Sequence, residues 1–380
     1  MISENKVSYY KADSYLEEEI TECVRKIFDD ISADDILKNA KKIVIKPNLV
    51  IRRGPDACST THPMMLTAVM KQLEKYDARK IIVESPGGFF NEAILKGLYK
   101  TTGFEDAAKN SGCELNFDVE SITIPSKRHG VIGEFNVLRE FEGADVIINL
   151  CKLKTHTLTT MSAASKNMYG AIPGLQKFEL HARFPEIERF SSMVLELTET
   201  LAPAINIVDA VYGMEGNGPN NGTARFFGGI FGSRSPFVCD VVCRDYLGLP
   251  ENSVEMLDVA NQMGLCPKTV GEITLVGDPE EYKKRKLKDL KMPDTKKLNL
   301  ITTFTQGFGG RFRRFLESRP VAMKDCKGCG KCADFCPAKA IKIVKGKAKI
   351  DREACIKCYC CQELCPFGLM GIKRFGIFDL

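Results

Sequence analysis

The sequence has no segment suited to crossing a membrane. No run of 18 apolar residues occurs along the chain, which argues against a membrane-spanning helix. The first 20 residues, MISENKVSYYKADSYLEEEI, have no apolar core of the kind found in a secretory signal peptide. We therefore expect a soluble, cytoplasmic protein.

Motifs for the common organic cofactors are also missing. The glycine-rich stretch at 213–222 matches neither GxGxxG nor a P-loop, so binding of a dinucleotide or a nucleoside triphosphate is not indicated. No flavin or haem motif is present. The basic segments come without a nucleic-acid recognition motif and without interleaved aromatic residues, so no nucleic-acid partner is expected.

Cysteine, by contrast, is plentiful and unevenly placed. Nine of the 16 cysteines fall between Cys326 and Cys365, where the pattern C-x2-C-x2-C-x3-C-P occurs twice, 29 residues apart. This is the ligand pattern of bacterial two-cluster ferredoxins, in which the fourth cysteine of each run binds the other cluster. The first cluster would be held by Cys326, Cys329, Cys332 and Cys365, and the second by Cys355, Cys358, Cys361 and Cys336.

A pair of zinc sites is the alternative, because thiolates also bind Zn²⁺. Zinc sites need only paired CxxC pieces, however, and not two matching runs that each end in Cys-Pro. Cys360 lies outside the ligand spacing and is not expected to be a ligand. The segment resembles bacterial-type ferredoxin domains, which predicts two [4Fe–4S] clusters and a cell that keeps exposed clusters reduced, such as an anaerobe.

Charge is distributed unevenly along the chain. Residues 1–278 carry 30 Lys and Arg against 38 Asp and Glu, a net charge of −8. Residues 279–320 carry 12 against 5, giving +7, and residues 321–380 carry 12 against 6, giving +6 before ligation. A basic cluster domain favours docking of an acidic electron carrier of ferredoxin or flavodoxin type, because complementary charge steers transient encounters.

Short apolar runs alternate with helical segments over residues 1–278. Strands are expected at 42–46, 80–84, 145–150, 204–208 and 272–276, and helices at 13–40, 62–76 (capped by Thr61), from 92, at 104–110, 185–201, 236–247 and 251–263. This alternation predicts an α/β domain with a mainly parallel sheet and helices on both faces. A basic linker with an amphipathic segment is expected at 279–320, a small α+β ferredoxin-like domain at 321–372 and a tail at 373–380.

Unusual polar sequence follows four of these strands: KPN at 46–48, ESPGG at 84–88, CKLKTH at 151–156 and DAVYGMEGNGP at 209–219. Ligands collect outside the carboxyl ends of the strands in such sheets. Lysines and amides that meet there suit a carboxylate or a phosphate, and the glycines of 213–222 could form a backbone nest for an anion. The residues expected to bind this anion are Lys46, Asn48, Lys154, Asn167, Gly170, Lys177, His181, Glu215 and Gly216. Those expected to take part in chemistry are His156, Lys152, Lys166 and Asp209. A solvated basic loop, structural histidines and capping carboxylates are the alternatives.

Four strings, IKPNLV, VESPGGF, INLCKLKTHTLTTMSAASKNMYGAIPG and VDAVYGMEGNGP, are followed by the two cysteine runs. Together they resemble the family called domain of unknown function 362, over about residues 40–250 and the C-terminal segment. The resemblance implies an iron–sulfur protein with an α/β domain, and it implies no settled reaction. The positions that match the family pattern are Lys46, Asn48, Lys152, Lys154, His156, Lys166, Asn167, Gly170, Asp209, Glu215 and Gly216.

Three functions remain open from the sequence. The first is a ferredoxin-fused reductase that acts on an anionic small molecule, with His156 supplying a proton. The second is a non-catalytic electron-transfer adaptor, and the third is non-redox chemistry in the α/β domain with structural or sensory clusters. An enzyme should hold the lysines and histidines in a pocket that faces a cluster, whereas an adaptor should leave them dispersed on an exposed surface.

Overall fold

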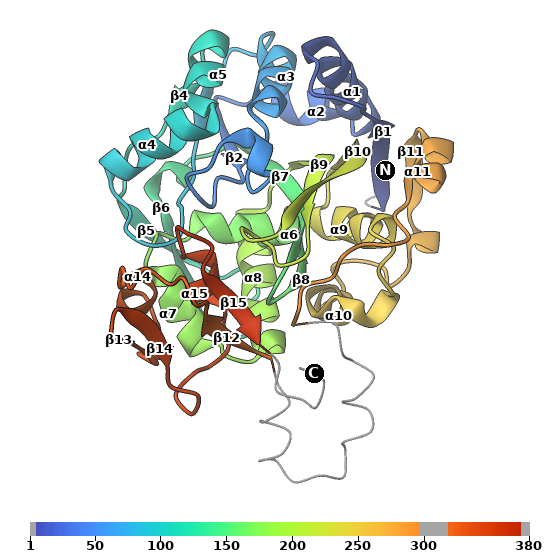
Figure 1. Cartoon of the computed structure of the whole chain (residues 1–380). Coiled ribbons are helices and arrows are strands. Elements are labelled where there is room, and N and C mark those ends of the chain that lie inside the picture. Colours follow the sequence, from blue (N-terminus) through green and yellow to red (C-terminus); the bar gives the residue numbers. More distant parts are fainter. Residues whose placement is uncertain (1–4, 296–317, 374–380) are drawn as a thin grey trace.

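A computed structural model of the chain describes residues 5–295 and 318–373 (Figure 1). The main domain is built on a nine-stranded sheet with the strand order β11-β1-β10-β9-β7-β2-β3-β4, and β8 pairs with β7. These strands are β1 Lys6–Lys11, β2 Lys42–Pro47, β3 Arg79–Ile82, β4 Glu114–Leu115, β7 Val146–His156, β8 Thr160–Ser162, β9 Ile205–Glu215, β10 Thr223–Ser233 and β11 Thr274–Gly277. Every pairing from β9 through β7, β2 and β3 to β4 is parallel, so the predicted mainly parallel sheet is confirmed.

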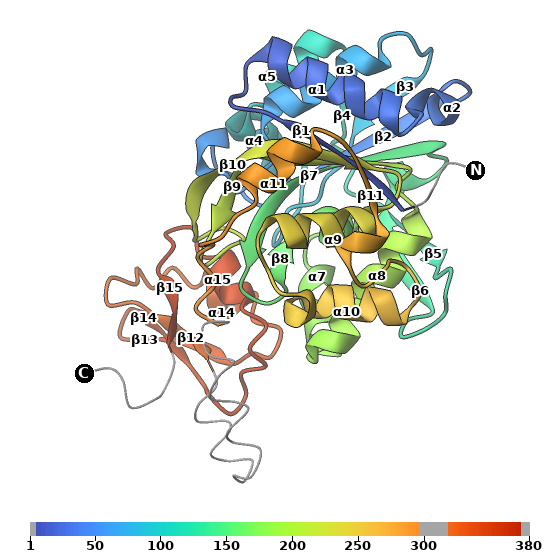
Figure 2. The ribbon, with the colours of Figure 1, turned by 90° about the vertical axis from the view of Figure 1, so that its right-hand side faces the viewer.

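Two apolar cores lie on opposite faces of this sheet. Side chains alternate along a strand, so Ile43 and Ile45 of β2 enter one core while Val44 enters the other. Helices cover both faces, as predicted (Figures 1 and 2). The helices on the first face are α1 Glu17–Asp30, α2 Ala33–Leu37, α3 Pro63–Leu73, α4 Glu92–Thr102 and α5 Phe104–Ser111. The second face carries α6 Ala164–Asn167, α7 Gln176–Arg183, α8 Ile187–Leu201, α9 Pro236–Tyr246 and α10 Glu255–Gln262.

Local sequence fixes several helix ends. Asn91 Oδ1 accepts a hydrogen bond from Ile94 N at 2.9 Å at the start of α4, and Gly103 ends this helix with φ of 77°. The predicted Thr61 cap of α3 is wrong, because His62 Nδ1 accepts from Met64 N at 3.2 Å instead. Thr61 Oγ1 donates to Leu150 O at 2.8 Å, which ties the loop after β2 to β7.

The two central strands are longer than predicted. The polar string CKLKTH belongs to β7, and DAVYGME belongs to β9; each strand has 11 residues. All of β7 is buried, because it lies between β2 and β9 in a sheet whose two faces are both covered by helices. Neither β1 nor the glycine-rich β10 was predicted, and these two strands pair antiparallel with each other. Polar residues that were expected in loops therefore lie on strands and point into the protein.

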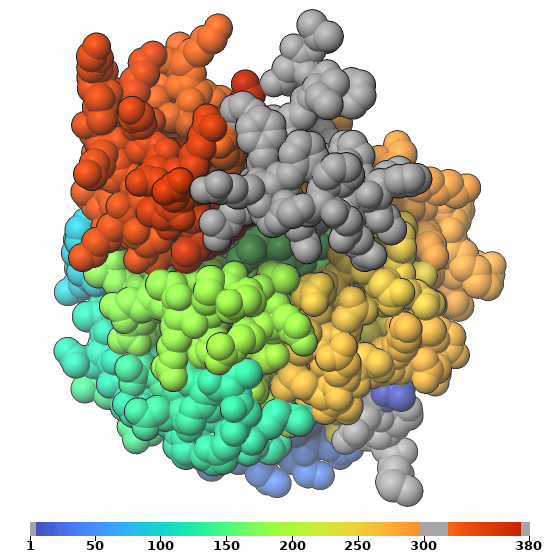
Figure 3. All heavy atoms as spheres, turned by 90° about the horizontal axis from the view of Figure 1, so that it is seen from below, coloured from blue at the N-terminus to red at the C-terminus, as the bar shows by residue number. Residues whose placement is uncertain are grey.

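A small second domain carries the cysteine runs. It contains two antiparallel pairs, β12 Arg319–Ala322 with β15 Met370–Lys373 and β13 Ile341–Val344 with β14 Lys347–Ile350. Two short helices, α14 Lys331–Asp334 and α15 Cys360–Glu363, complete it. Figure 3 shows this domain as an orange-to-red lobe seated against the main domain.

The remaining elements are peripheral. A hairpin of β5 Ser121–Pro125 and β6 Glu134–Leu138 forms a separate sheet, and α11 Pro279–Arg285 occupies the start of the expected linker. Short 3₁₀ turns occur at η1 Pro55–Ala57, η2 Arg139–Phe141, η3 Met168–Ala171, η4 Glu251–Ser253 and η5 Val270–Glu272. Most of the predicted amphipathic segment and all but the first residue of the tail lie outside the described residues. Within 5–295 and 318–373, none of the helices has the length and apolar character needed to span a bilayer.

Candidate functional site

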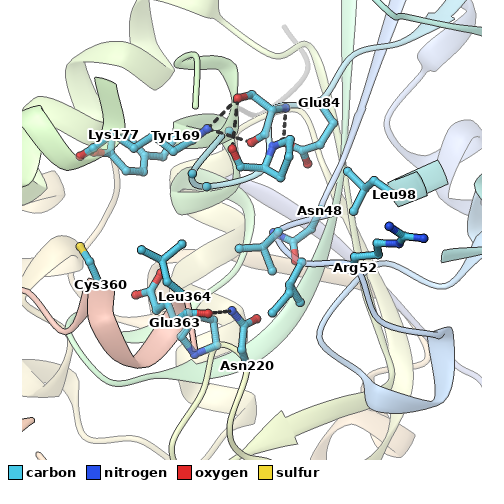
Figure 4. Close-up of a pocket in the computed structure, with 18 of the residues that line it drawn as sticks. Asn48, Arg52, Glu84, Leu98, Tyr169, Lys177, Asn220, Cys360, Glu363 and Leu364 are labelled. Carbon is cyan, nitrogen blue, oxygen red and sulfur yellow. Dashed lines mark hydrogen bonds between the residues drawn. The ribbon is translucent and has the colours of Figure 1, made fainter. Parts of the chain in front are cut away.

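A cavity of about 520 Å³ lies between the carboxyl ends of the central strands and the small domain (Figure 4). Its walls come from the loops after β2 and β3, from the end of β7, from α6 and η3, and from α15 of the small domain. The predicted site residues that line it are Lys46, Asn48, Lys154, His156, Lys166, Asn167, Gly170, Lys177 and His181. Most of the predicted anion-binding and chemical residues therefore share one cavity.

A buried ion pair forms the floor of the site. Lys46 Nζ lies 3.0 Å from Glu84 Oε2, and the carboxylate also accepts hydrogen bonds from Leu49 N and Ser85 N, both at 2.8 Å. Burial lowers the pKa of Lys46, and the charge of Glu84 opposes that shift. Gly170 packs directly over the pair, where a Cβ would collide with Lys46 Nζ and Glu84 Oε1. Gly170 is thus needed for close packing over two charges.

Substitution of Gly170 by alanine should lower the free energy of unfolding by about 1–3 kcal/mol, because the added methyl group has to displace one member of a buried ion pair. Gly133→Ala is the matched control, since a Cβ at Gly133 meets no atom within 4 Å. Denaturant unfolding followed by far-UV circular dichroism measures both variants. Equal stabilities would contradict the close packing at Gly170.

Lys154 is held by a chain of amides. Its Nζ donates to Asn48 Oδ1 at 2.7 Å and to Ser59 O at 2.6 Å. Asn48 Nδ2 donates to Asn167 Oδ1 at 3.0 Å, and Asn167 Nδ2 donates to Asn149 Oδ1 at 2.8 Å. Burial lowers the pKa of Lys154 to about 7. The amides position this lysine through neutral oxygen atoms, so they leave its charge available to a bound anion.

Lys177 is positioned in a similar way. Its Nζ donates to Ser85 O at 2.8 Å, to Ser85 Oγ at 3.0 Å and to Ile172 O at 2.6 Å. Burial lowers the pKa of Lys177 to about 7 as well. The ESPGG string therefore supplies acceptors to Lys46 and Lys177 through Glu84 and Ser85.

Lys166 differs from these three lysines. Within the described residues its ammonium group has no hydrogen-bond partner, and it lies over the rings of Tyr169 and Phe190, with Nζ 5.1 and 5.7 Å from the ring centroids. Burial lowers the pKa of Lys166, and the carboxylate of Glu363 opposes that shift. Its donors are therefore available to a ligand.

The two histidines have different surroundings. His156 Nδ1 accepts hydrogen bonds from Leu158 N at 3.1 Å and Thr159 N at 3.4 Å, so a neutral ring carries its proton on Nε2, which lies 3.4 Å from Glu363 Oε1. His181 stacks on Phe190 with ring centroids 4.4 Å apart. Burial, aided by the charge of Lys166, lowers the pKa of His181 to about 3. His181 is therefore neutral, whereas His156 presents a proton to the cavity.

Four predicted residues do not line the cavity. Lys152 Nζ donates to Asp209 Oδ2 at 2.7 Å, to Tyr15 OH at 2.9 Å and to Tyr212 O at 2.8 Å, and both charged side chains are buried. Glu215 Oε2 pairs with Arg225 Nη1 at 2.8 Å, and Gly216 N donates to Lys291 O at 2.8 Å. Gly218 N likewise donates to Gly216 O. Both N–H groups are therefore bonded to backbone carbonyl groups, and they do not form a nest for an anion. Lys152 and Asp209 do not line the cavity because they face each other across the paired strands β7 and β9.

The wall opposite the lysines belongs to the small domain. Asn220 Nδ2 donates to Glu363 O at 3.0 Å and Asn221 Nδ2 donates to Gln362 O at 2.9 Å, which attaches α15 to the loop after β9. Phe335 packs on Phe89 and on Phe178, with ring centroids 4.7 and 5.8 Å apart. Cys360, Glu363 and Leu364 thereby face the cavity (Figure 4).

Sequence reasoning missed some residues of this cavity. Glu84 is the last residue of the apolar run KIIVE. A carboxylate at the end of a buried strand indicates that a buried cation lies close to it. Glu363 carried no such signal, since it is a spacer between two cysteines of a metal motif. Arg52 and Arg53, which follow the IKPNLV string, also line the cavity.

The eight motif cysteines gather into the two expected quartets. Cys326, Cys329, Cys332 and Cys365 surround one small cavity of the domain. Cys336, Cys355, Cys358 and Cys361 surround another. Backbone donors point at sulfur in both quartets, with Ala340 N 3.2 Å from Cys336 Sγ and Leu369 N 3.2 Å from Cys365 Sγ. Such N–H···S bonds are typical of iron–sulfur ligands, so the residues fit clusters at both places.

The buried lysines should make anion binding depend on pH. Lys154 and Lys177 have pKa values of about 7 because they are buried, so both are charged below pH 7 and neutral well above it. Affinity for sulfate, whose charge does not change in this range, should fall about tenfold or more between pH 6 and pH 9. Calorimetry at both pH values measures it, and proton uptake on binding should appear as a dependence on buffer ionisation enthalpy. Equal affinity at both pH values would contradict this result.

Comparison with known proteins gives two family matches. The family described as Domain of unknown function (DUF362) matches residues 43–245, and the family described as 4Fe-4S dicluster domain matches residues 325–369. The chain is 28% identical over 274 residues to "Thylakoid-associated protein sll1697" of Synechocystis sp., covering 70% of this chain and 82% of that protein. It is 33% identical over 61 residues to "Uncharacterized ferredoxin MJ0155" of Methanocaldococcus jannaschii, covering 16% of this chain and 40% of that one.

Among solved structures, the lactate racemase apoprotein from Thermoanaerobacterium thermosaccharolyticum aligns with a TM-score of 0.38 and 14% identity, covering 63% of this chain and 57% of that chain. A likeness of this size carries no argument about the present site. The C-terminal match, in contrast, identifies a 4Fe–4S ferredoxin domain. That domain supports an iron–sulfur electron-transfer role.

Proposed function

The chain belongs to the DUF362 family, and for this member we propose a reductase that passes electrons from its ferredoxin domain to an anionic small molecule held in the interdomain cavity. The observation that carries the proposal is the position of the cavity. Lysines of the α/β domain line one side, and α15, which lies between the cluster cysteines Cys358 and Cys365, lines the other. An adaptor would have no need to enclose these lysines.

Lys166 has a different role in the proposed anion binding from Lys154 and Lys177. Lys166 has donors free of protein partners among the described residues and lies in the cavity with Glu363 and Cys360. Lys154 and Lys177 are already fixed by neutral oxygen acceptors, so they contribute charge and little new hydrogen bonding. A bound carboxylate or phosphate would favour the charged forms of both lysines, because an opposite charge raises a lysine pKa.

A hydrogen-bond donor is also present. With Nδ1 occupied by backbone N–H groups, His156 holds its proton on Nε2 at the wall shared with Glu363. Reduction of an anion adds negative charge, and a hydrogen bond donated from this atom would stabilise it. His156 is therefore assigned the role of hydrogen-bond donor to the developing charge.

Two clusters are proposed, one for each cysteine quartet. When bound, they supply electrons one at a time, and two of them together match a two-electron reduction. The protein's own contribution is to place both quartets in the domain that closes the cavity, with the first quartet bordering it through Lys331 and Pro366.

The test is anaerobic purification followed by mass spectrometry of any co-purifying small molecule, with the reduced protein then mixed with that compound. We expect an acid or phosphate ester that reoxidises the clusters. Lys166→Met should weaken its binding about tenfold or more, because one charge-assisted contact is lost. Lys283→Met is the control, since Lys283 is exposed on α11.

Two outcomes would favour the other functions. A compound that binds but is converted equally well by oxidised and reduced protein would indicate non-redox chemistry. Reoxidation only by another protein, with no small-molecule binding, would indicate an adaptor.

A further inference from the structure

The outer side of the ferredoxin domain carries a dense group of positive charges. We call it the lysine face, and it consists of the exposed residues Lys324, Lys327, Lys339, Lys342, Lys345, Lys347 and Lys349. Asp325 and Asp334 are the two acidic residues within 324–349. The loop before α14 and the β13–β14 hairpin supply most of these lysines, so they come from two stretches of one small fold.

Apolar side chains lie among the lysines. Ile343, Val344 and Phe367 are 38, 45 and 54% exposed. Ile343 and Phe367 line the same small cavity as the first cysteine quartet, and Cys329 of that quartet is itself exposed. An apolar centre with a charged rim is the anatomy of a protein interface, and here a cluster ligand lies beside two of the apolar residues.

The first quartet also borders the large cavity. Lys331 and Pro366 line both the quartet's cavity and the interdomain cavity. The β13–β14 hairpin lies on the outer side of the domain, whereas α15 faces the sheet (Figures 1 and 2). The first quartet is thus placed between the lysine face and the ligand cavity.

We propose that the lysine face is the docking surface for an acidic electron-carrier protein of ferredoxin or flavodoxin type. Charge complementarity steers such a carrier toward the face, and the exposed apolar residues allow a short-lived contact over Cys329. An anionic membrane would attract the same lysines, but it would bring no redox group to the exposed ligand. The inference rests on the electron-transfer role and not on the reductase reaction.

The test uses the full-length protein with its clusters and an acidic flavodoxin as the probe. Lys342→Glu/Lys345→Glu/Lys347→Glu reverses the hairpin charges. Lys41→Glu/Lys100→Glu/Lys109→Glu makes the same change in net charge at exposed lysines of the α/β domain. Calorimetry measures binding of oxidised flavodoxin, and stopped-flow absorbance measures cluster reduction by reduced flavodoxin. Each measurement is made at about 20 and about 300 mM salt. These concentrations lie below and above the ionic strength at which the Debye length is about 8–10 Å.

We expect the hairpin variant to lose about tenfold or more in both binding and reduction rate at low salt, and to lose most of its salt dependence. The control variant should stay within about twofold of the unchanged protein. Dithionite should reduce all three proteins at the same rate, which shows that the clusters are intact.

Equal behaviour of the hairpin and control variants toward flavodoxin would overturn the proposal. So would a hairpin variant that loses binding to phosphatidylglycerol vesicles while keeping its reaction with flavodoxin, which would assign the face to a membrane. Failure of small-molecule reduction would leave these results unchanged, so the two proposals can be separated.

Discussion

Cys332→Ser/Cys365→Ser should retain about four of about eight irons per chain, whereas Cys332→Ser/Cys336→Ser should lose nearly all of them. The reason is that Cys332 lines the same small cavity as Cys365, and not the one lined by Cys336, which is the next cysteine of its own run. Removal of two ligands from one quartet spares the other cluster, and removal of one from each damages both. Iron and sulfide analysis after anaerobic purification, with electron paramagnetic resonance of the reduced protein, measures the difference.

Cys360→Ser is the control, because Cys360 lines the ligand cavity and belongs to neither quartet. It should keep all of the iron. If the Cys332/Cys336 pair kept half of the iron and the Cys332/Cys365 pair kept none, each run of four would hold its own cluster and the exchange of fourth ligands would be wrong.

Asp209→Ala should lower the free energy of unfolding by about 3–5 kcal/mol, because it leaves the buried ammonium of Lys152 without its counter-charge. The carboxylate also accepts hydrogen bonds from Tyr15 OH at 2.7 Å and from His62 N at 3.0 Å, and both donors lose their acceptor. Guanidinium unfolding followed by far-UV circular dichroism measures the loss. Lys152→Met/Asp209→Leu, which removes both charges, should recover a good part of it.

Asp35→Asn provides the comparison for this change. Asp35 pairs with Lys38 at 3.5 Å on the surface of the protein, and its loss should cost less than about 0.5 kcal/mol. An Asp209→Ala protein of full stability that could no longer reduce its substrate would instead place Asp209 in the chemistry, as the sequence suggested.

Much of the fold could be predicted from the sequence because the strands at 42–46, 80–84 and 145–150 are short apolar runs with clear ends. β1 and β10 were missed for the opposite reason. β1 reads KVSYYK and β10 reads TARFFGGIFGS, and neither has an unbroken run of β-branched residues. Their pairing with each other and with β9 stabilises both as strands, which is a tertiary effect that the local sequence does not carry.

The cavity could be predicted in part. Lys46, Lys154 and Lys177 were found because lysine is unusual at the end of a buried strand or beside glycine-rich turns. Lys152 was grouped with them because it lies two residues from Lys154. The strand order decides their separation, since Lys152 reaches Asp209 on β9 while Lys154 reaches Asn48 after β2, on the other side of β7. Sequence adjacency contains no information about which strands are neighbours.

The place of α15 has a consequence for how such proteins can diversify. Cys360, Glu363 and Leu364 are spacers of a metal-binding motif, yet they also form a wall of the interdomain cavity, the proposed ligand site. A truncated chain that ends before the second domain would present an open trough, and a chimera with a foreign two-cluster module would acquire a different wall. If the proposed function holds, selectivity for the ligand and the supply of electrons are inherited together, and changes between the cysteines can alter the first without disturbing the second.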